Sequence, residues 1–338
     1  MAEILMADYN ERHLKYARLS MEDIRKTMPP EYAKVMIQTR KELANLRVSN
    51  DKAIIALWED AAVEVSKKIR KSNGLKKQHL RNVLLDILRE LNKAYRDLMK
   101  TDLSEAIKLQ YDFNRDIMWQ ITKSQPSVEK LISKAGLSHV YSGLADEAAK
   151  AFLARKTAGL TLSQRIWRNN QQAYSIILKL ATTGDLSSYE MARALEKYLT
   201  KDASALTVGE SKILMERFKG TLPKDIKYAA FRLARTEITN AFAQSTYSAG
   251  GKNPFYKGIE WRLSTAHRSS IQCACPGLVG FHAKGNEPDI PHPNCMCSQI
   301  PVLDEMKAAT ERAIRWVNDP SADGDMERWY QNVYLKGA

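Results

Sequence analysis

The sequence lacks any apolar run long enough to cross a bilayer, and its first twenty residues lack the apolar core of a secretion signal. We therefore expect a protein without a membrane anchor that is made and kept in a reducing cytoplasm. Stable disulfides are uncommon in that compartment. A chain of 338 residues also has enough core to fold without a covalent staple.

Cysteine is scarce, and all four cysteines lie in the short segment 273–297. Three explanations compete: a disulfide staple, a catalytic cysteine and a structural metal site. The reducing compartment disfavours the staple. Four thiols together disfavour a single nucleophile, which also needs a base and an orienting group. A tetrahedral Zn²⁺ site is the remaining functional explanation, because thiolate and imidazole are its usual ligands.

The candidate zinc ligands fall in a Cys/His knot at 267–297 that is rich in Gly and Pro. They are Cys273, Cys275, His292, Cys295, Cys297 and His267. One residue separates the cysteines of each pair, so we expect both thiolates of a pair to reach one ion only with strain. A second ligand set is therefore open: His267 and Cys273 from one side, and His292 with Cys295 or Cys297 from the other. A metal-free core of reduced thiols is the non-functional alternative.

A zinc hydrolase needs an open coordination position and a positioned carboxylate. Glu287 and Asp289 are available, but they lie in a Pro-flanked loop and not in a helical His-Glu-x₂-His frame. We therefore expect no enzymatic activity.

Glycine and proline are absent from residues 31–72, which predicts a long helix there. After a turn at Asn73-Gly74, apolar residues recur at spacings of three and four and predict a second long helix. Shorter helices are predicted over 126–235. Strand-like segments appear only at 257–264 and 298–303, followed by a last helix.

These patterns predict a mainly α fold with a small C-terminal α+β domain. We expect a long-helix region at 1–125 that docks partners, and a second domain at 126–338 that contains the knot.

Basic residues outnumber acidic ones, with 52 Lys and Arg against 39 Asp and Glu and a net charge of +13. Such an excess favours a polyanionic partner, most often nucleic acid. No carboxylate occurs between Glu64 and Asp86. A solvated helix face is the simpler interpretation of these charges. The candidate contacts with double-stranded DNA are Lys67, Lys68, Arg70, Lys71, Lys76, Lys77, Arg89, Lys93, Arg96 and Lys100.

Three segments occur in a characteristic order: "RLARTEITNAFAQSTYSAG" (232–250), "IEWRLSTAHRSSIQCACPGLVG" (259–280) and "PDIPHPNCMCSQIPV" (288–302). An Arg-Thr-Glu helix, a Trp-bearing strand, a Cys cluster and His-Pro-Asn-Cys-x-Cys resemble the phage head morphogenesis family, the Mu F-like minor head proteins. The resemblance covers roughly 150–303. Many members have Cys-x₂-Cys where this chain has Cys273-Ala-Cys275, and often Arg where it has Met296.

The resemblance implies a minor capsid protein of a tailed phage or prophage, made in the bacterial cytoplasm and retained in the capsid interior of the virion. Its partners would be the portal, capsid and scaffold proteins and packaged DNA, with roles in head assembly and in genome organisation or ejection. One alternative is an intracellular zinc-containing DNA-binding protein. An ADP-ribosyltransferase-like enzyme is another, for which Arg262 and Ser264 are present but no downstream Glu-x-Glu.

Overall fold

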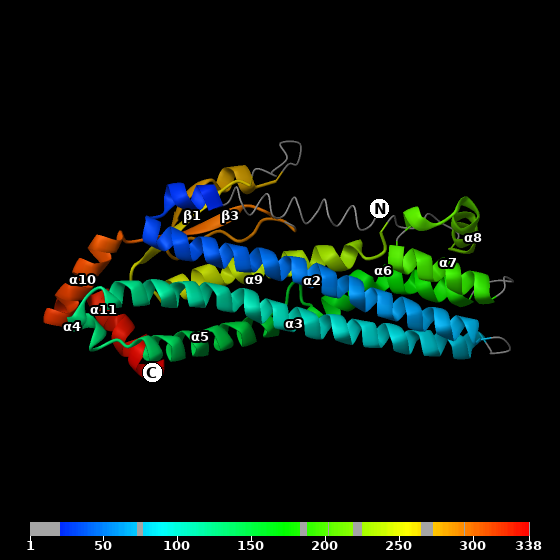
Figure 1. The fold of residues 1–338 in the computed structure, drawn as a ribbon, viewed down its shortest axis with the longest axis horizontal. Helices are drawn as coiled ribbons and strands as arrows, with labels where there is room; N and C mark the ends of the chain where they lie inside the picture. Colours follow the sequence, from blue (N-terminus) through cyan, green and yellow to red (C-terminus); the bar gives the residue numbers. More distant parts are fainter. Residues whose placement is uncertain are drawn as a thin grey trace. The chain divides into compact units, whose positions relative to one another are not determined.

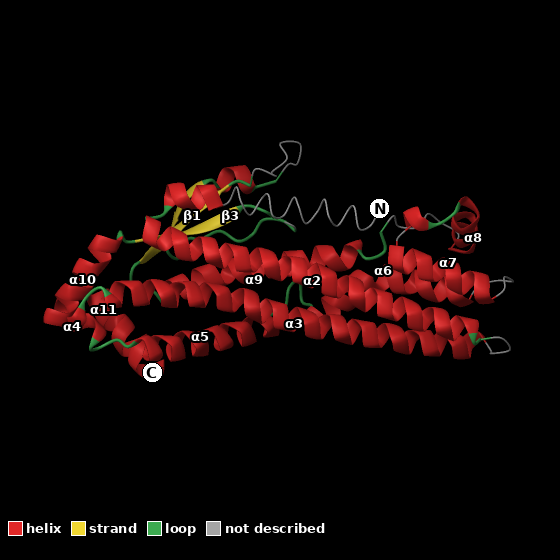
Figure 2. Ribbon diagram, viewed as in Figure 1, coloured by secondary structure: helices red, strands yellow, loops and turns green. Residues whose placement is uncertain are grey.

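The computed structural model describes residues 21–72, 77–182, 188–201, 203–218, 225–264, 273–293 and 295–337. These residues are mainly helical, with one small antiparallel sheet near the C-terminus (Figure 2). The predicted fold class is therefore confirmed. None of the described helices has a segment apolar and long enough to span a membrane.

The chain divides into two compact units, each assembled from separate stretches of sequence. The described residues of unit 1 lie in Val48–Thr101 and Ala154–Arg235, and those of unit 2 in Arg12–Arg47, Asp102–Leu153 and Thr236–Ala338. Figure 1 shows the two long helices, α2 (Pro30–Arg70) and α3 (Lys77–Lys123). Residues of each helix belong to both units. The roles predicted for 1–125 and 126–338 stay predictions.

The apolar face predicted for the start of α3 is buried in the core of unit 1. The buried residues of this face recur every three or four positions: Leu80, Leu84, Leu88, Leu91 and Tyr95. The hydroxyl of Tyr95 also donates to the main-chain oxygen of Ala230 at 2.7 Å, in α9. The remaining helices of the unit are α6 (Leu162–Thr182), α7 (Ser188–Lys201), the 3₁₀ turn η1 (Ala203–Ala205) and α8 (Val208–Phe218).

Unit 2 contains the sheet, parts of α2 and α3, and several shorter helices. These shorter helices are α4 (Pro126–Glu129), α5 (Lys134–Ala154), most of α9 (Tyr228–Gly251), α10 (Met306–Asn318), α11 (Gly324–Trp329) and α12 (Leu335–Gly337). Short helical turns complete it: η2 (Cys275–Leu278), η3 (Pro320–Ala322) and the π-helical η4 (Tyr330–Tyr334).

The sheet has the order β2-β1-β3, and both pairings are antiparallel. β1 spans Tyr256–Arg262, β2 spans Gly280–Ala283 and β3 spans Ser298–Leu303. Ile259 and Trp261 are fully buried, whereas Glu260 between them is half-buried, as the alternation of β1 predicts. The strand β2 was not predicted, because four residues with an exposed Phe281 give no clear pattern.

The acidic residues after α10 hold the last turns of the chain together. The carboxylate of Asp319 accepts from the N–H of Ser321 at 2.9 Å, and that of Glu327 accepts from the indole N–H of Trp316 at 2.8 Å. Asp323 accepts from the guanidinium of Arg312. Asp319, Asp323 and Glu327 are therefore engaged in contacts within the C-terminal part of unit 2.

Candidate metal centre

The sheet register brings the two cysteine pairs to one place. Trp261, near the end of β1, pairs with Gly280 at the start of β2, and Arg262 pairs with Ser298 at the start of β3. The segments that enter β2 and β3 therefore meet at the same end of the sheet. Cys273 and Cys275 lie in the first of these segments, and His292, Cys295 and Cys297 in the second.

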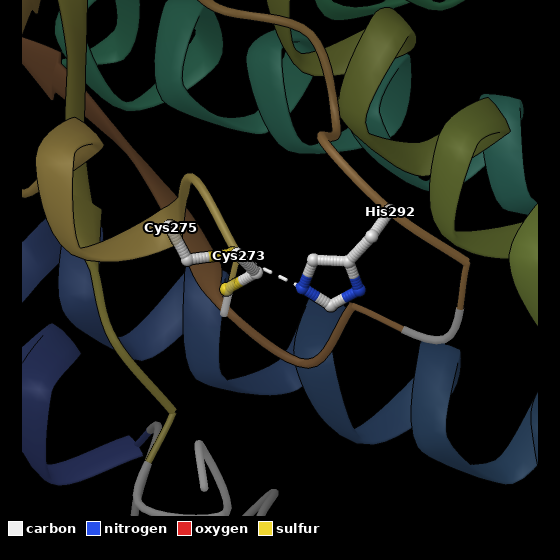
Figure 3. A group of neighbouring side chains, drawn as sticks. All are labelled: Cys273, Cys275 and His292. Atoms are coloured by element: carbon white, nitrogen blue, oxygen red, sulfur yellow. Dashed lines mark hydrogen bonds between the residues drawn. The ribbon is translucent and has the colours of Figure 1, made fainter. Parts of the chain in front are cut away.

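The side chains form two overlapping groups of possible ligands. Cys273, Cys275 and His292 have their donor atoms within 4.8 Å of one another, and so do Cys275, Cys295 and Cys297. Figure 3 shows the first group, with the imidazole of His292 turned toward the thiols and a dashed line marking a hydrogen bond. Cys275 belongs to both groups. Of the predicted ligands, His267 lies outside the described residues.

The distances fit a tetrahedral ion better than a covalent bond. The sulfurs of Cys275 and Cys295 are 3.7 Å apart, whereas a disulfide requires about 2.05 Å. Two thiolates bound to one zinc ion at about 2.3 Å would lie roughly 3.8 Å apart. Nε2 of His292 is 3.2 Å from the sulfur of Cys275. The cluster is therefore compatible with a metal site.

The hydrogen bonding of His292 places its free lone pair toward the thiols. Its Nδ1 lies 2.9 Å from the main-chain oxygen of Pro293, which can only accept, so Nδ1–H is the donor. In the neutral ring Nε2 then carries the lone pair, and Nε2 is the atom that faces Cys275. A main-chain carbonyl that orients a histidine in this way is typical of metal ligands.

In both Cys-x-Cys pairs, the two thiols lie within 4.8 Å of each other in a single group. Cys295 and Cys297 directly precede β3. In an extended segment, residues two apart point to the same side. Cys273 and Cys275 lie at the entry to η2, where Pro276 turns the chain.

Burial and neighbouring thiols raise the pKa values of Cys275 and Cys295. Cys275, Cys295 and Cys297 are buried, and Cys273 is half-buried. Burial, assisted by a hydrogen bond with Cys273, raises the pKa of Cys275 to about 12. The hydrogen bond with Cys297, followed by burial, raises the pKa of Cys295 well above its usual range. Metal binding requires thiolates, so it would release protons here.

Two other polar residues of the knot are already engaged elsewhere. Nε2 of His282 lies 2.7 Å from the main-chain oxygen of Leu278. The carboxylate of Glu287 accepts from the hydroxyl of Tyr256 at 2.9 Å and from the N–H of Gly285 at 2.7 Å. Neither side chain belongs to the two groups of possible metal ligands within the described part of the knot.

The described members of the predicted DNA-binding set are exposed or half-exposed on or next to α2 and α3, but many of them form ion pairs with nearby carboxylates. The paired carboxylates reduce the positive field at these side chains. Because exposed ion pairs of this kind contribute only about 0–1 kcal/mol each, they would not prevent contacts of the same side chains with DNA. Lys68, Lys71 and Lys77 are exposed, and Lys76 lies outside the described residues. The ion-paired members of the set are Lys67, Arg70, Arg89, Lys93, Arg96 and Lys100.

The Arg-Thr-Glu segment of α9 has a structural role at its first residue. The guanidinium of Arg235 donates to both carboxylate oxygens of Asp51, at 3.3 and 2.9 Å, and the side chain of Asp51 is 2% exposed. Arg262, a candidate residue of the transferase alternative, pairs with Glu260 at 3.2 Å.

Sequence reasoning missed Arg40, whose guanidinium reaches the main chain of β3 just after the cysteines. A single arginine inside a regular helical pattern carries no signal of such a contact. No protein-family model, no curated protein and no solved structure matches the chain.

Proposed function

We propose that the chain is a minor structural protein of a tailed-phage head, and that a zinc ion locks its sheet. The observation that carries this proposal is the convergence of the Cys273–Cys275 and His292–Cys297 segments at one end of the sheet. These are the segments in which the sequence resembles the head morphogenesis family. A structural ion there has a clear physical purpose, because the loops it joins have little apolar surface of their own.

The donor set supports zinc in this site. Sulfur and imidazole donors suit a zinc ion, and each of the two groups offers three donors, with Cys275 common to both. A tetrahedral ion bound by one group would take its fourth ligand from the other. The ion would join the entry of β2 to the entry of β3, and its binding free energy would add to the free energy of folding. The carboxylate of Glu287 is committed to Tyr256 and Gly285, which favours a structural site over a hydrolytic one.

Elemental analysis of protein purified without a chelator tests the metal. We expect about one zinc ion per chain in the wild type and a loss of zinc in Cys275→Ser. The matched control is His282→Gln, which changes a histidine of the same segment outside the ligand groups and should keep the metal. Metal-free protein with four freely titrating thiols, and with a stability that added zinc leaves unchanged, would contradict the proposal.

The partner contacts are assigned to the long helices. An apolar groove of about 580 Å³ lies between α2 and α3 in unit 1 and supports this assignment. Its apolar lining includes Leu57, Ala61, Val83, Ile87 and Leu91. Such a groove suits an amphipathic helix of a portal or scaffold subunit.

Incorporation into particles tests the head assignment. Wild-type protein should copurify with portal and capsid subunits, and Ile87→Asp should enter procapsids in reduced copy number. The control Val63→Asp replaces an exposed apolar residue of α2 that does not line the groove. Copurification with DNA but not with head subunits would favour the free DNA-binding protein.

A further inference from the structure

Arg40 places a guanidinium inside unit 2 without a carboxylate beside it. Its Nη2 donates to the main-chain oxygen of Gln299 at 2.6 Å, and its carbon Cζ lies 4.7 Å from the centre of the Phe242 ring. Its Nε is buried and has no hydrogen-bond partner. Within the described residues, the guanidinium forms no ion pair.

Two other arginines of the fold, each with a side chain mostly covered, have carboxylate partners. Arg235 pairs with Asp51, and Arg312 pairs with Asp304 and Asp323. Burial, followed by repulsion from Arg47, lowers the pKa of Arg40 to about 9. These surroundings therefore disfavour the charged form of the Arg40 guanidinium. A charged group in such surroundings needs a counter-charge.

Hydrogen bonds through Gln299 connect this unmatched cation to the segment that carries Cys297. Gln299, which accepts from Arg40, is two residues after Cys297, and its side-chain amide donates to the main-chain oxygen of Cys297 at 3.5 Å. Tyr247 lies near enough to both Cys295 and Arg40 for each to influence its pKa. Its pKa is raised mainly by burial, then by nearby acidic groups that include Cys295, and Arg40 opposes the rise.

A zinc–thiolate centre supplies the missing negative charge. A divalent zinc ion with three thiolates and one imidazole carries one net negative charge, and with four thiolates it carries two. Such a buried anion needs compensation, and the half-buried guanidinium of Arg40 carries charge of the opposite sign. The unmatched guanidinium and the proposed anionic centre therefore complement each other.

We infer that Arg40 is a positioning residue that compensates the charge of the zinc–thiolate centre and couples zinc binding to the packing of α2 on β3. This inference rests on the proposed zinc site. It has an unusual consequence for stability. In the metal-free protein the charge of Arg40 is a cost, whereas in the zinc-loaded protein it stabilises the centre.

The test compares Arg40→Met and Arg40→Lys with the wild-type full chain. Zinc affinity is measured by competition with a chromophoric chelator, and the stability of the metal-free protein by urea unfolding. We expect Arg40→Met to lower the zinc affinity by about 10- to 100-fold, the range for groups that support metal ligands. Metal-free Arg40→Met should be at least as stable as the metal-free wild type. Arg40→Lys, which keeps the charge, should retain most of the affinity.

A matched control is Arg262→Met. Arg262 pairs in β1 with Ser298 at the start of β3, but its charge is already matched by Glu260. Its removal should leave the zinc affinity unchanged.

Three outcomes would overturn the inference. In the first, Arg40→Met binds zinc as tightly as the wild type while its metal-free form is less stable, which makes Arg40 a clamp on the main chain of Gln299 only. In the second, Arg40→Lys loses as much zinc affinity as Arg40→Met. If Arg40→Met does not fold, a loss of about 10-fold or more in Arg40→Lys has the same meaning. In the third, the wild type binds no zinc, and this result alone overturns the proposed site as well.

Discussion

Arg312 in α10 joins two nearly buried carboxylates, and its replacement gives a sharp test of what stabilises unit 2. Its Nε and Nη2 donate to Asp323 at 2.6 and 2.9 Å, while Nη1 contacts Asp304 and the main-chain oxygen of Pro254. The side chains of Asp304 and Asp323 are 10% and 8% exposed. Arg312→Met removes the cation and leaves both carboxylates in place.

The loss of stability in Arg312→Met depends on what remains beside each carboxylate. Among the described residues, Asp323 has no other ion pair, whereas Asp304 has a second one. Removing one partner of a buried ion pair costs about 3–5 kcal/mol, because a buried charge is left uncompensated. Asp304 keeps Lys257 at 2.6 Å, so the low end of that range applies. We expect the free energy of unfolding to fall by about 3 kcal/mol. For a unit of 150–250 residues this corresponds to a loss of roughly 6–12 °C in Tm.

The effect should depend on pH in a defined direction. Burial is the largest influence on Asp323 and raises its pKa, but hydrogen bonds from Arg312 and from the N–H of Met326 outweigh it, so its pKa lies below the usual value. Its stabilising contribution is therefore present above the unfolded pKa of about 3.9 and is lost as the pH falls through the folded pKa. In Arg312→Met the pKa of Asp323 should rise, and protonation should relieve the penalty. The difference in unfolding free energy between wild type and Arg312→Met should therefore become smaller as the pH falls from 7 to about 4.

Urea unfolding followed by tryptophan fluorescence measures this difference, because Trp316 lies in the same helix as Arg312. The control is Arg328→Met. Arg328 and its partner Asp325 are 71% and 61% exposed, so we expect a loss below about 1 kcal/mol. The reasoning is refuted if Arg312→Met costs less than about 1 kcal/mol, or if its cost is the same at pH 7 and pH 4.

Three further predictions concern the sheet, a buried amide pair and DNA. A Cβ on Gly258, whose φ is +149°, would lie 2.0 Å from the main-chain oxygen of His282. Gly258→Ala should therefore separate β2 from β1, and faster hydrogen exchange of the β2 amides would show it. The side-chain N–H of Asn253 donates to Asn114 at 3.0 Å in the core, so Asn253→Ala should cost about 1–3 kcal/mol in urea unfolding; an unchanged midpoint would contradict this. Nonspecific binding to duplex DNA should weaken steeply with salt, and glutamine substitution should flatten that dependence. The substitutions are at the exposed lysines Lys68, Lys71 and Lys77.

The sequence by itself determined the class of the fold and the place of the candidate site. The spacing of apolar residues in α3 predicted which face is buried, because helix periodicity alone decides which side chains share a face. The alternation around Trp261 predicted β1 in the same way. The concentration of all four cysteines in one segment, beside histidines, predicted the place of a candidate metal site, because thiolate and imidazole are the usual zinc ligands.

The tertiary structure alone decided which donors meet and which charges are matched. Pairing of β1 with both β2 and β3 places Cys275 at the centre of the cluster, and this depends on a strand too short to predict. The basic pattern of α3 was visible in the sequence, but its pairing with carboxylates one turn away depends on side-chain geometry. Arg40 and Gln299 are 259 residues apart and meet only when α2 packs on β3. Contacts at such separations leave no local pattern, because the free energy that selects them comes from burial and charge in the folded core.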